Sequence, residues 1–392
     1  MTFGLKGCAH ILEQVAKALY KRVPDTGKTF LKTSWLTLRR AAFKLPYMVS
    51  YVRAALVRKD VTEDAFDVLY VMDFHDEDWI LGAICRRIAK ESKGRIGYYH
   101  HRHFYSSGDR DPFWPVVPKL PDAKNYFFAD APFLAWCLKS HPPLWHRKTF
   151  AYDTHPRERI SDRELVFALN QATHTISMCS AHRNELISKG LRPERVTTII
   201  GGADKDVFTA HDRSPDGLIG FCANYYPRKN PDRIIEIVER MPHRNFVLLA
   251  GSKKWQDYPR FQHLKNLPNL EYVETTYDRY PEYYGKMTVF ASVSLVEGGP
   301  IPLLEAMMSN VAPVASRTGF GEDVIRHGEN GYLFDPYAPT DEVCELIEKG
   351  FSLKTDVRST VFRHTWQEFA REVNRKFDRS ESYPQIPEEI PS

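Results

Sequence analysis

Two glutamates eight residues apart, Glu297 and Glu305, mark the segment whose residue types are best suited to chemistry. Glu297 follows an apolar run that is typical of a buried strand, and Pro300–Ser309 is typical of a helix with prolines in its first turn, where a missing N–H costs nothing. Gly298 and Gly299 lie at the junction, where the lack of a Cβ lets a ligand approach the backbone.

A helix start offers unpaired N–H donors and a positive dipole end to a phosphate. We expect the amides from Gly298 through Pro300 to Ile301 to hold a diphosphate, while Glu305, one turn further along, accepts hydrogen bonds from sugar hydroxyls. The segment therefore predicts a binding site for a sugar nucleotide.

The same residues resemble the E-x7-E signature of retaining glycosyltransferases of the GT-B fold, especially the large family-4 group. The resemblance extends to about Tyr332: EAMMSNVAPVAS is similar to that family's EAMA-x-G-x-PVVAS, and GFGEDVIRHGENGYLF to its GG-x-x-EVI-x-x-G-x-NGYLV. Glutamates at this spacing also occur by chance, as an exposed helix residue and an unrelated loop residue. Their place within a long ordered run of similar positions favours the glycosyltransferase.

From Phe66 onward, short apolar runs alternate with helical patterns, which is typical of parallel sheets covered by helices. Strands are predicted first at Asp67–Met72, Ile96–His100, Asn125–Ala129, Lys148–Tyr152, Thr173–Met178 and Val196–Ile200, and later at Leu218–Cys222, Asn245–Ala250, Leu270–Val273, Val289–Val293 and Ala312–Ala315. Helices are predicted between them, among others at Asp162–Gln171 and Pro231–Arg240. The fold class is therefore α/β: two Rossmann-like doubly wound domains facing a cleft, as the GT-B resemblance implies, with an extra N-terminal helical segment.

The expected organisation has five parts. They are a basic amphipathic helical segment (1–60), an acceptor domain (61–210), a nucleotide-sugar domain (211–362), a helix returning to the first domain (363–380) and a tail (381–392). GGADKDVF at Gly201–Phe208 resembles the family's interdomain linker NGVD-x-x-x-F, and RHTWQEFAREVNRKF resembles its last helix. The tail is polar and rich in proline, which predicts disorder.

Shorter motifs indicate further contacts to the diphosphate. CANYYPRKN resembles the family's GR-x-x-x-x-KN loop, whose arginine and lysine hold the leaving phosphates; Lys229 matches the lysine, but Asn224 stands in the arginine's position. Arg228 could supply the second cation, although adjacent residues usually point in different directions, and Lys229 could instead be a solvated loop lysine. Gly251 matches the family's strand-ending glycine beside the nucleotide, and Tyr272–Tyr277 a loop that borders the base.

The resemblance also implies a mechanism. Lys229 and the helix-start amides would stabilise the departing nucleoside diphosphate more in the transition state than in the ground state. Glu297 is also predicted to be a catalytic residue. The family retains the anomeric configuration and uses no bound metal, so no cofactor is expected.

The first domain is less informative. AYDTHPRER resembles the YD-x-HE segment of many relatives, which makes His155 the candidate active-site histidine; His101, in YYHHRH, is its rival because relatives often carry T-x-H there. A lone histidine is more often structural, although one at the carboxyl end of a strand in a cleft is a better candidate. The histidine cluster matches no zinc spacing, and Asp109–Asp111, which has the D-x-D letters of another glycosyltransferase fold, precedes the loop PFWPVVPKLP.

Composition and charge limit the partners. A net charge of +4 gives no support to nucleic-acid binding, no apolar stretch approaches the roughly 20 residues of a membrane span, and the scattered cysteines indicate reduced thiols in a cytoplasmic protein. In residues 1–60, basic and apolar residues alternate with helical periodicity at 8–22 and 34–57. These helices either bind the anionic inner face of the cell membrane or pack on the first domain and expose their lysines.

We therefore expect a hexosyl-type glycosyltransferase that carries a sugar from a nucleoside diphosphate to a glycan or lipid-linked acceptor, in cell-surface polysaccharide or lipopolysaccharide synthesis. A nucleotide-sugar epimerase of the same fold is one alternative, and it would need no acceptor. A non-catalytic partner of a polysaccharide assembly complex is the other, favoured by Asn224 and by the lack of a glycine-rich loop after the first strand.

Overall fold

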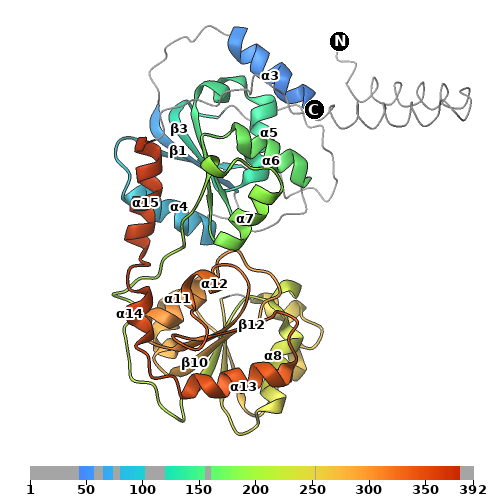
Figure 1. The fold of residues 1–392 in the computed structure, drawn as a ribbon, viewed down its shortest axis with the longest axis vertical. Coiled ribbons are helices and arrows are strands. Elements are labelled where there is room, and N and C mark those ends of the chain that lie inside the picture. Colours follow the sequence, from blue (N-terminus) through green and yellow to red (C-terminus); the bar gives the residue numbers. More distant parts are fainter. Residues whose placement is uncertain are drawn as a thin grey trace, which may run out of the picture.

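The computed structural model describes residues 44–56, 65–73, 80–101, 120–154, 160–251 and 253–379. They form two domains that follow one another along the long axis of the molecule (Figure 1), each built on a six-stranded sheet. Among the described helices, none combines the length and the apolar character needed to cross a bilayer.

The first domain is a parallel sheet in the order β2-β1-β3-β4-β5-β6. Its strands are β1 (Phe66–Asp73), β2 (Ile96–His101), β3 (Ala123–Phe128), β4 (Lys148–Asp153), β5 (His174–Ser177) and β6 (Val196–Thr198). Its helices are α3 (Leu45–Leu56), α4 (Ile80–Lys90), α5 (Ala131–Ser140), α6 (Asp162–Gln171) and α7 (Ser180–Ser188), with the short 3₁₀ turns η2 (Pro142–His146) and η3 (Pro193–Arg195). The central strands are buried on both faces, as parallel sheets require, and the predicted strands of this half are confirmed to within about two residues at each end.

Helix α3 contacts α5 and η2 through a face that buries Tyr47 and Ala54. Its opposite face leaves four large apolar side chains exposed: Leu45, Met48, Val49 and Val52. This end of the basic segment therefore packs on the first domain, but it presents an apolar surface outward. The remainder of residues 1–60 lies outside the described residues.

The second domain is a parallel sheet in the order β12-β11-β10-β7-β8-β9. Its strands are β7 (Leu218–Cys222), β8 (Phe246–Ala250), β9 (Leu270–Glu274), β10 (Met287–Ser292), β11 (Ala312–Ser316) and β12 (Tyr332–Phe334). Its helices are α8 (Pro231–Arg240), α9 (Phe261–Lys265), α10 (Tyr280–Tyr284), α11 (Ile301–Met308), α12 (Gly321–Val324), α13 (Thr340–Phe351) and α14 (Val357–Val361), with the 3₁₀ turns η4 (Pro227–Lys229), η5 (Lys253–Asp257) and η6 (Tyr277–Arg279). The sequence patterns predict neither β12 nor α13.

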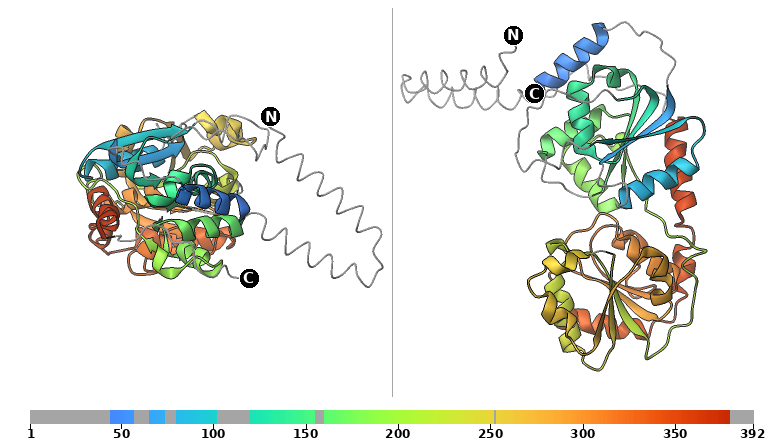
Figure 2. Two further views of the ribbon diagram at one scale, coloured as in Figure 1. Left: turned by 90° about the horizontal axis from the view of Figure 1, so that it is seen from above. Right: turned by 180° about the vertical axis from the view of Figure 1, so that it is seen from behind.

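The last helix, α15 (Trp366–Arg379), returns to the first domain and packs on α4, as Figure 1 and the rear view in Figure 2 show. Just before it, Thr365 pairs with Ala203 of the chain that leads into the second domain. Phe377 then packs on Phe150 of β4, with 4.4 Å between ring centroids. The two chain crossings are thus tied to each other and to the first domain.

Candidate functional site

The loops that follow β7 and β10 meet at one point of the second sheet. The two strands are neighbours, but the chain continues from β7 to β8 on one side and from β10 to β11 on the other. Ligands of open α/β sheets bind where the strand order reverses in this way, at the carboxyl ends. Lys229 lies in the first of these loops and Glu297 in the second, so the fold brings the two predicted residues together.

Glu297 is the centre of a polar cluster at this point, with a side chain that is 6% exposed. Its Oε2 accepts a hydrogen bond from Arg228 Nη1 at 3.2 Å, and its Oε1 accepts from the Ser294 hydroxyl at 2.6 Å and from the Lys229 ammonium. Burial alone would raise the pKa of Glu297, but the charges of Lys229 and Arg228 lower it, so the carboxylate is ionised at neutral pH.

The expectation that Arg228 and Lys229 point apart is wrong. The 3₁₀ turn η4 brings both side chains to the same carboxylate, and the turn itself is fixed because Leu295 N–H donates to the Arg228 carbonyl at 2.8 Å. Two cations beside one carboxylate leave a net positive charge, which suits a phosphate. The Asn224 side chain lies close to Gly251, the residue that follows β8.

Glu305 lies in the second turn of α11 and is 1% exposed. Its Oε1 accepts a hydrogen bond from the Tyr277 hydroxyl at 2.6 Å, and its Oε2 accepts a longer one from Tyr284 at 3.4 Å. Burial raises the pKa of Glu305 to about 7, although the tyrosine hydroxyls and the charge of Arg87 favour the ionised form. The carboxylate that is predicted to accept hydrogen bonds from sugar hydroxyls therefore already accepts them from two tyrosine hydroxyls of the protein.

The prediction that the amides of Gly298–Ile301 hold a diphosphate needs one correction. Pro300 has no N–H, and the Ile301 N–H donates to the carbonyl of Gly299 at 2.9 Å. The amides of Gly298 and Gly299 are what remains of the predicted set as candidates for a diphosphate.

The two glycines are also where the domains touch. A Cβ on Gly298 would overlap the carbonyl oxygen of Thr154, and one on Gly299 would overlap the sulfur of Met178, both in the first domain. Nearby, the Ser180 N–H at the start of α7 donates to Asp323 of the second domain at 3.0 Å. The absence of side chains on the loop is thus required for the domains to approach each other.

The predicted histidines are only partly located. His155 and Asp109–Asp111 lie outside the described residues, whereas His101 ends β2, the edge strand, and its side chain is not described. Thr154, next to His155 in the chain, touches the Gly298 loop. Within the ranges that the structure describes, no group of three or more His, Cys, Asp or Glu side chains could hold a metal ion.

One buried cluster was not predicted. His182 Nε2 lies 3.0 Å from Asp153 Oδ2 at the end of β4, and its Nδ1 lies 3.2 Å from Glu185 Oε2. Burial would lower the pKa of His182, but the two carboxylates raise it. The cluster holds the end of β4 just before His155. Asp153 belongs to the AYDTHPRER motif, but no local spacing in the sequence connects it to His182.

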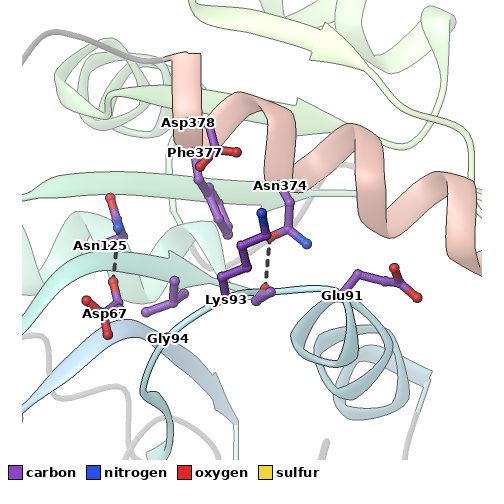
Figure 3. A pocket seen from close by; sticks show the side chains of 10 residues that line it. Asp67, Glu91, Lys93, Gly94, Asn125, Asn374, Phe377 and Asp378 are labelled. Atoms are coloured by element: carbon purple, nitrogen blue, oxygen red, sulfur yellow. Dashed lines mark hydrogen bonds between the residues drawn. The ribbon is translucent and has the colours of Figure 1, made fainter.

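A separate cavity of about 360 Å³ lies at the amino ends of β1 and β3, under α15. Figure 3 shows Asp67, Asn125, Lys93 and Asn374 around it, and the Ser92 hydroxyl donates to Asn374 Oδ1 at 2.8 Å. It is remote from the carboxyl-end cluster, and none of the predicted site residues lines it.

A comparison with protein families matches the part of the chain that carries the polar cluster at the carboxyl ends of β7 and β10. Residues 203–372 match the family Glycosyl transferases group 1. These residues include Arg228, Lys229, Glu297 and Glu305, so the whole polar cluster lies within the matched region.

One curated relative is an uncharacterized glycosyltransferase of Methanocaldococcus jannaschii, 24% identical over 184 residues. The aligned stretch covers 47% of this chain and 50% of the relative, so the chain spans about half the length of the curated relative that it matches.

Solved structures resemble the whole two-domain arrangement. HepE from Anabaena in complex with UDP has a TM-score of 0.64 at 16% identity, covering 80% of this chain and 99% of that one. The lipopolysaccharide outer core galactosyltransferase WaaB has a TM-score of 0.60 at 12% identity, covering 79% and 99%. At such identities the likeness shows the fold alone. The predicted fold class, two Rossmann-like domains in the GT-B arrangement, is confirmed.

Proposed function

We propose that this protein is a glycosyltransferase that moves a sugar from a nucleoside-diphosphate sugar to a glycan or lipid-linked saccharide. The observation that carries the proposal is the cluster of Arg228, Lys229 and Glu297 at the switch point of a sheet whose domain matches Glycosyl transferases group 1. The likeness to HepE, whose structures include complexes with UDP and with UDP-glucose, supports a nucleotide-sugar donor.

The chemistry follows from the charges. When the bond between the anomeric carbon and the diphosphate breaks, negative charge grows on the phosphate oxygens and positive charge on the sugar. Lys229 and Arg228, held by the ionised Glu297, together with the Gly298 and Gly299 amides, would stabilise those oxygens without moving during the reaction. Retention of configuration and independence of a divalent metal belong to the proposal, as does His155, with His101 as its rival, as the active-site histidine.

The proposed acceptor and pathway rest on the likeness to WaaB. WaaB is named as a lipopolysaccharide galactosyltransferase and has the same fold, which agrees with a saccharide acceptor in cell-surface polysaccharide or lipopolysaccharide synthesis. A hexose donor is the corresponding proposal for the sugar.

Calorimetric titration with UDP, GDP and ADP tests the donor site. We expect one of them to bind the wild-type protein and Glu305→Gln to weaken that binding by about 2- to 5-fold, because the amide accepts hydroxyl hydrogen bonds less well than a carboxylate. Transfer from the matching sugar nucleotide to a lipid-linked or glycan acceptor should persist in excess chelator.

Other outcomes separate the alternatives. Conversion of the sugar nucleotide without any acceptor would favour the epimerase. Binding without turnover for any donor and acceptor would favour a non-catalytic partner, and loss of transfer in chelator would restore a metal site to the mechanism.

We further propose that the protein works at the inner face of the cell membrane, attached through α3 and the basic segment before it. Both Figure 1 and Figure 2 place α3 at the end of the first domain that is remote from the second domain. The four exposed apolar side chains of its outer face stand beside the exposed Arg53, and each basic residue near an anionic surface contributes about 1 kcal/mol.

Sedimentation with vesicles tests this attachment. The intact protein should bind vesicles containing phosphatidylglycerol at low salt, should release as salt screens the charges, and should ignore neutral phosphatidylcholine. Exchanging both Met48 and Val52 for serine should weaken binding by roughly 30-fold or more, since each exchange removes roughly 1–2 kcal/mol of apolar burial and about 1.4 kcal/mol is a factor of ten. Val207→Ser, an exposed apolar residue near the domain linker, is the matched control. Failure of the intact protein to bind anionic vesicles at low salt would refute the proposal.

A further inference from the structure

The two hydroxyls bound to Glu305 differ in their freedom to leave it. Tyr284 is fully buried in α10, where its hydroxyl also donates to the Pro302 carbonyl at 3.3 Å and its ring packs on Phe290. Tyr277 is 46% exposed and stands at the start of η6, although its hydroxyl lies only 2.6 Å from the carboxylate. The Tyr277 side chain can therefore turn outward, whereas that of Tyr284 cannot without disturbing the core.

The ring of Tyr277 is held only lightly. It makes an edge contact with Phe208, at 6.0 Å between centroids, and a tilted contact with Tyr280 at 5.6 Å. The chain reaches it directly from β9, where the Thr275 N–H donates to the carbonyl of Ala250, the residue before Gly251. Tyr277 thus lies beyond the carboxyl end of β9, and its hydroxyl donates to a carboxylate that is almost fully buried.

We propose that the Tyr277 hydroxyl occupies, in the free protein, the place that the ribose hydroxyls of a bound nucleotide take on Glu305. Donor binding then exchanges one hydroxyl for another on the same carboxylate oxygen. The inference rests on the proposed function, because it concerns a nucleotide at this site.

The hydrogen bond from Tyr277 stabilises Glu305 when no nucleotide is bound. A buried carboxylate without a partner is costly, so Tyr277 keeps the empty site satisfied. The consequence is that a ribose hydroxyl gains only the difference between its own hydrogen bond and the one it displaces. A nucleotide that lacks ribose hydroxyls leaves Tyr277 in place and loses little. Tyr277 therefore reduces the preference of the site for ribose.

Calorimetric titration compares ribonucleotide with dideoxyribonucleotide on three proteins: wild type, Tyr277→Phe and Tyr283→Phe. The probes are whichever of UDP, GDP and ADP binds the wild type, and its 2′,3′-dideoxy form. Tyr283 lies in α10, the helix that directly follows η6, with its ring against Lys286, and serves as the hydroxyl-removal control. Thermal unfolding monitors the fold of each variant.

In Tyr277→Phe we expect the ribonucleotide to bind about 5- to 10-fold more tightly, while the dideoxy form is unchanged, because only the first must displace the hydroxyl. Tyr283→Phe should leave both affinities at the wild-type value. Weaker ribonucleotide binding in Tyr277→Phe, or an equal shift for both probes, would overturn the exchange while leaving the proposed function intact. If none of the three nucleoside diphosphates binds the wild type, the proposed function fails and the exchange fails with it.

Discussion

Replacing Glu297 by glutamine should reduce sugar transfer by roughly 10²- to 10⁴-fold. The carboxylate holds Arg228 and Lys229 through separate oxygens, and hydrogen bonds to charged groups contribute about 1.5–3 kcal/mol each, while about 1.4 kcal/mol corresponds to a factor of ten in rate. Glutamine keeps the shape but removes the charge, so the two cations repel each other and lose their fixed direction toward the diphosphate. Initial rates of sugar transfer at saturating donor concentration measure the effect. The nucleotide affinity of the same variant is measured separately.

A matched control lies in the same domain. Glu322 pairs with Arg317 at 2.8 Å on an exposed surface, and Glu322→Gln should leave the rate unchanged because surface pairs contribute little. Thermal unfolding shows whether a variant with a reduced transfer rate is still folded. A Glu297→Gln protein that keeps more than about a third of the wild-type rate would show that the carboxylate does not position the cations.

Much of the fold could be predicted because local signals agree with it. Helix α6 has the predicted bounds, since the Ser161 side chain accepts from the Glu164 N–H at its start and the chain turns extended after Gln171. Strand β12, by contrast, has three residues, too few for a period to be visible, and it is a strand only because it pairs with β11. Helix α7 is capped by a cysteine, Cys179, which is not among the usual start signals.

Some contacts of the candidate site could likewise be predicted from the sequence, and others could not. The gathering of Lys229 and Glu297 could be predicted, because each follows a strand and carboxyl ends of parallel strands meet at one edge. That Arg228 and Lys229 share one carboxylate depends on the turn η4, which the motif does not specify. The hydrogen bond of Tyr277 to Glu305 joins residues 28 positions apart on different elements, so no sequence period reports it.

The role of Gly298 also emerges only from three dimensions. Sequence reasoning assigns the glycine to a ligand, whereas in the folded chain its missing side chain faces the carbonyl of Thr154 in the other domain. The Thr154 carbonyl oxygen belongs to the backbone directly after β4, so it cannot move aside as a flexible side chain can. The same segment leads to His155, so the loop that carries Glu297 and Gly298 is in contact with the first domain.

Gly298→Ala should therefore lower sugar transfer by roughly 10- to 100-fold, because overpacking at a fixed contact costs about 1–3 kcal/mol. The strain falls on the approach of the two domains, so nucleotide affinity should fall much less than the rate. Small-angle X-ray scattering should show a larger radius of gyration than that of the wild type, both with and without nucleotide. Thermal unfolding should show both domains folded.

Gly285→Ala is the matched control, since Gly285 is exposed at the end of α10 and the nearest atom to an added Cβ is the Pro281 carbonyl oxygen at 3.3 Å. That variant should keep the wild-type rate and scattering. If Gly298→Ala transfers sugar as fast as the wild type with unchanged scattering, the glycine contact does not limit closure. If rate and nucleotide affinity fall together with unchanged scattering, the glycine serves the diphosphate directly. A slower rate with an expanded molecule and nearly intact nucleotide affinity is the result expected when catalysis requires the Gly298 loop to reach Thr154.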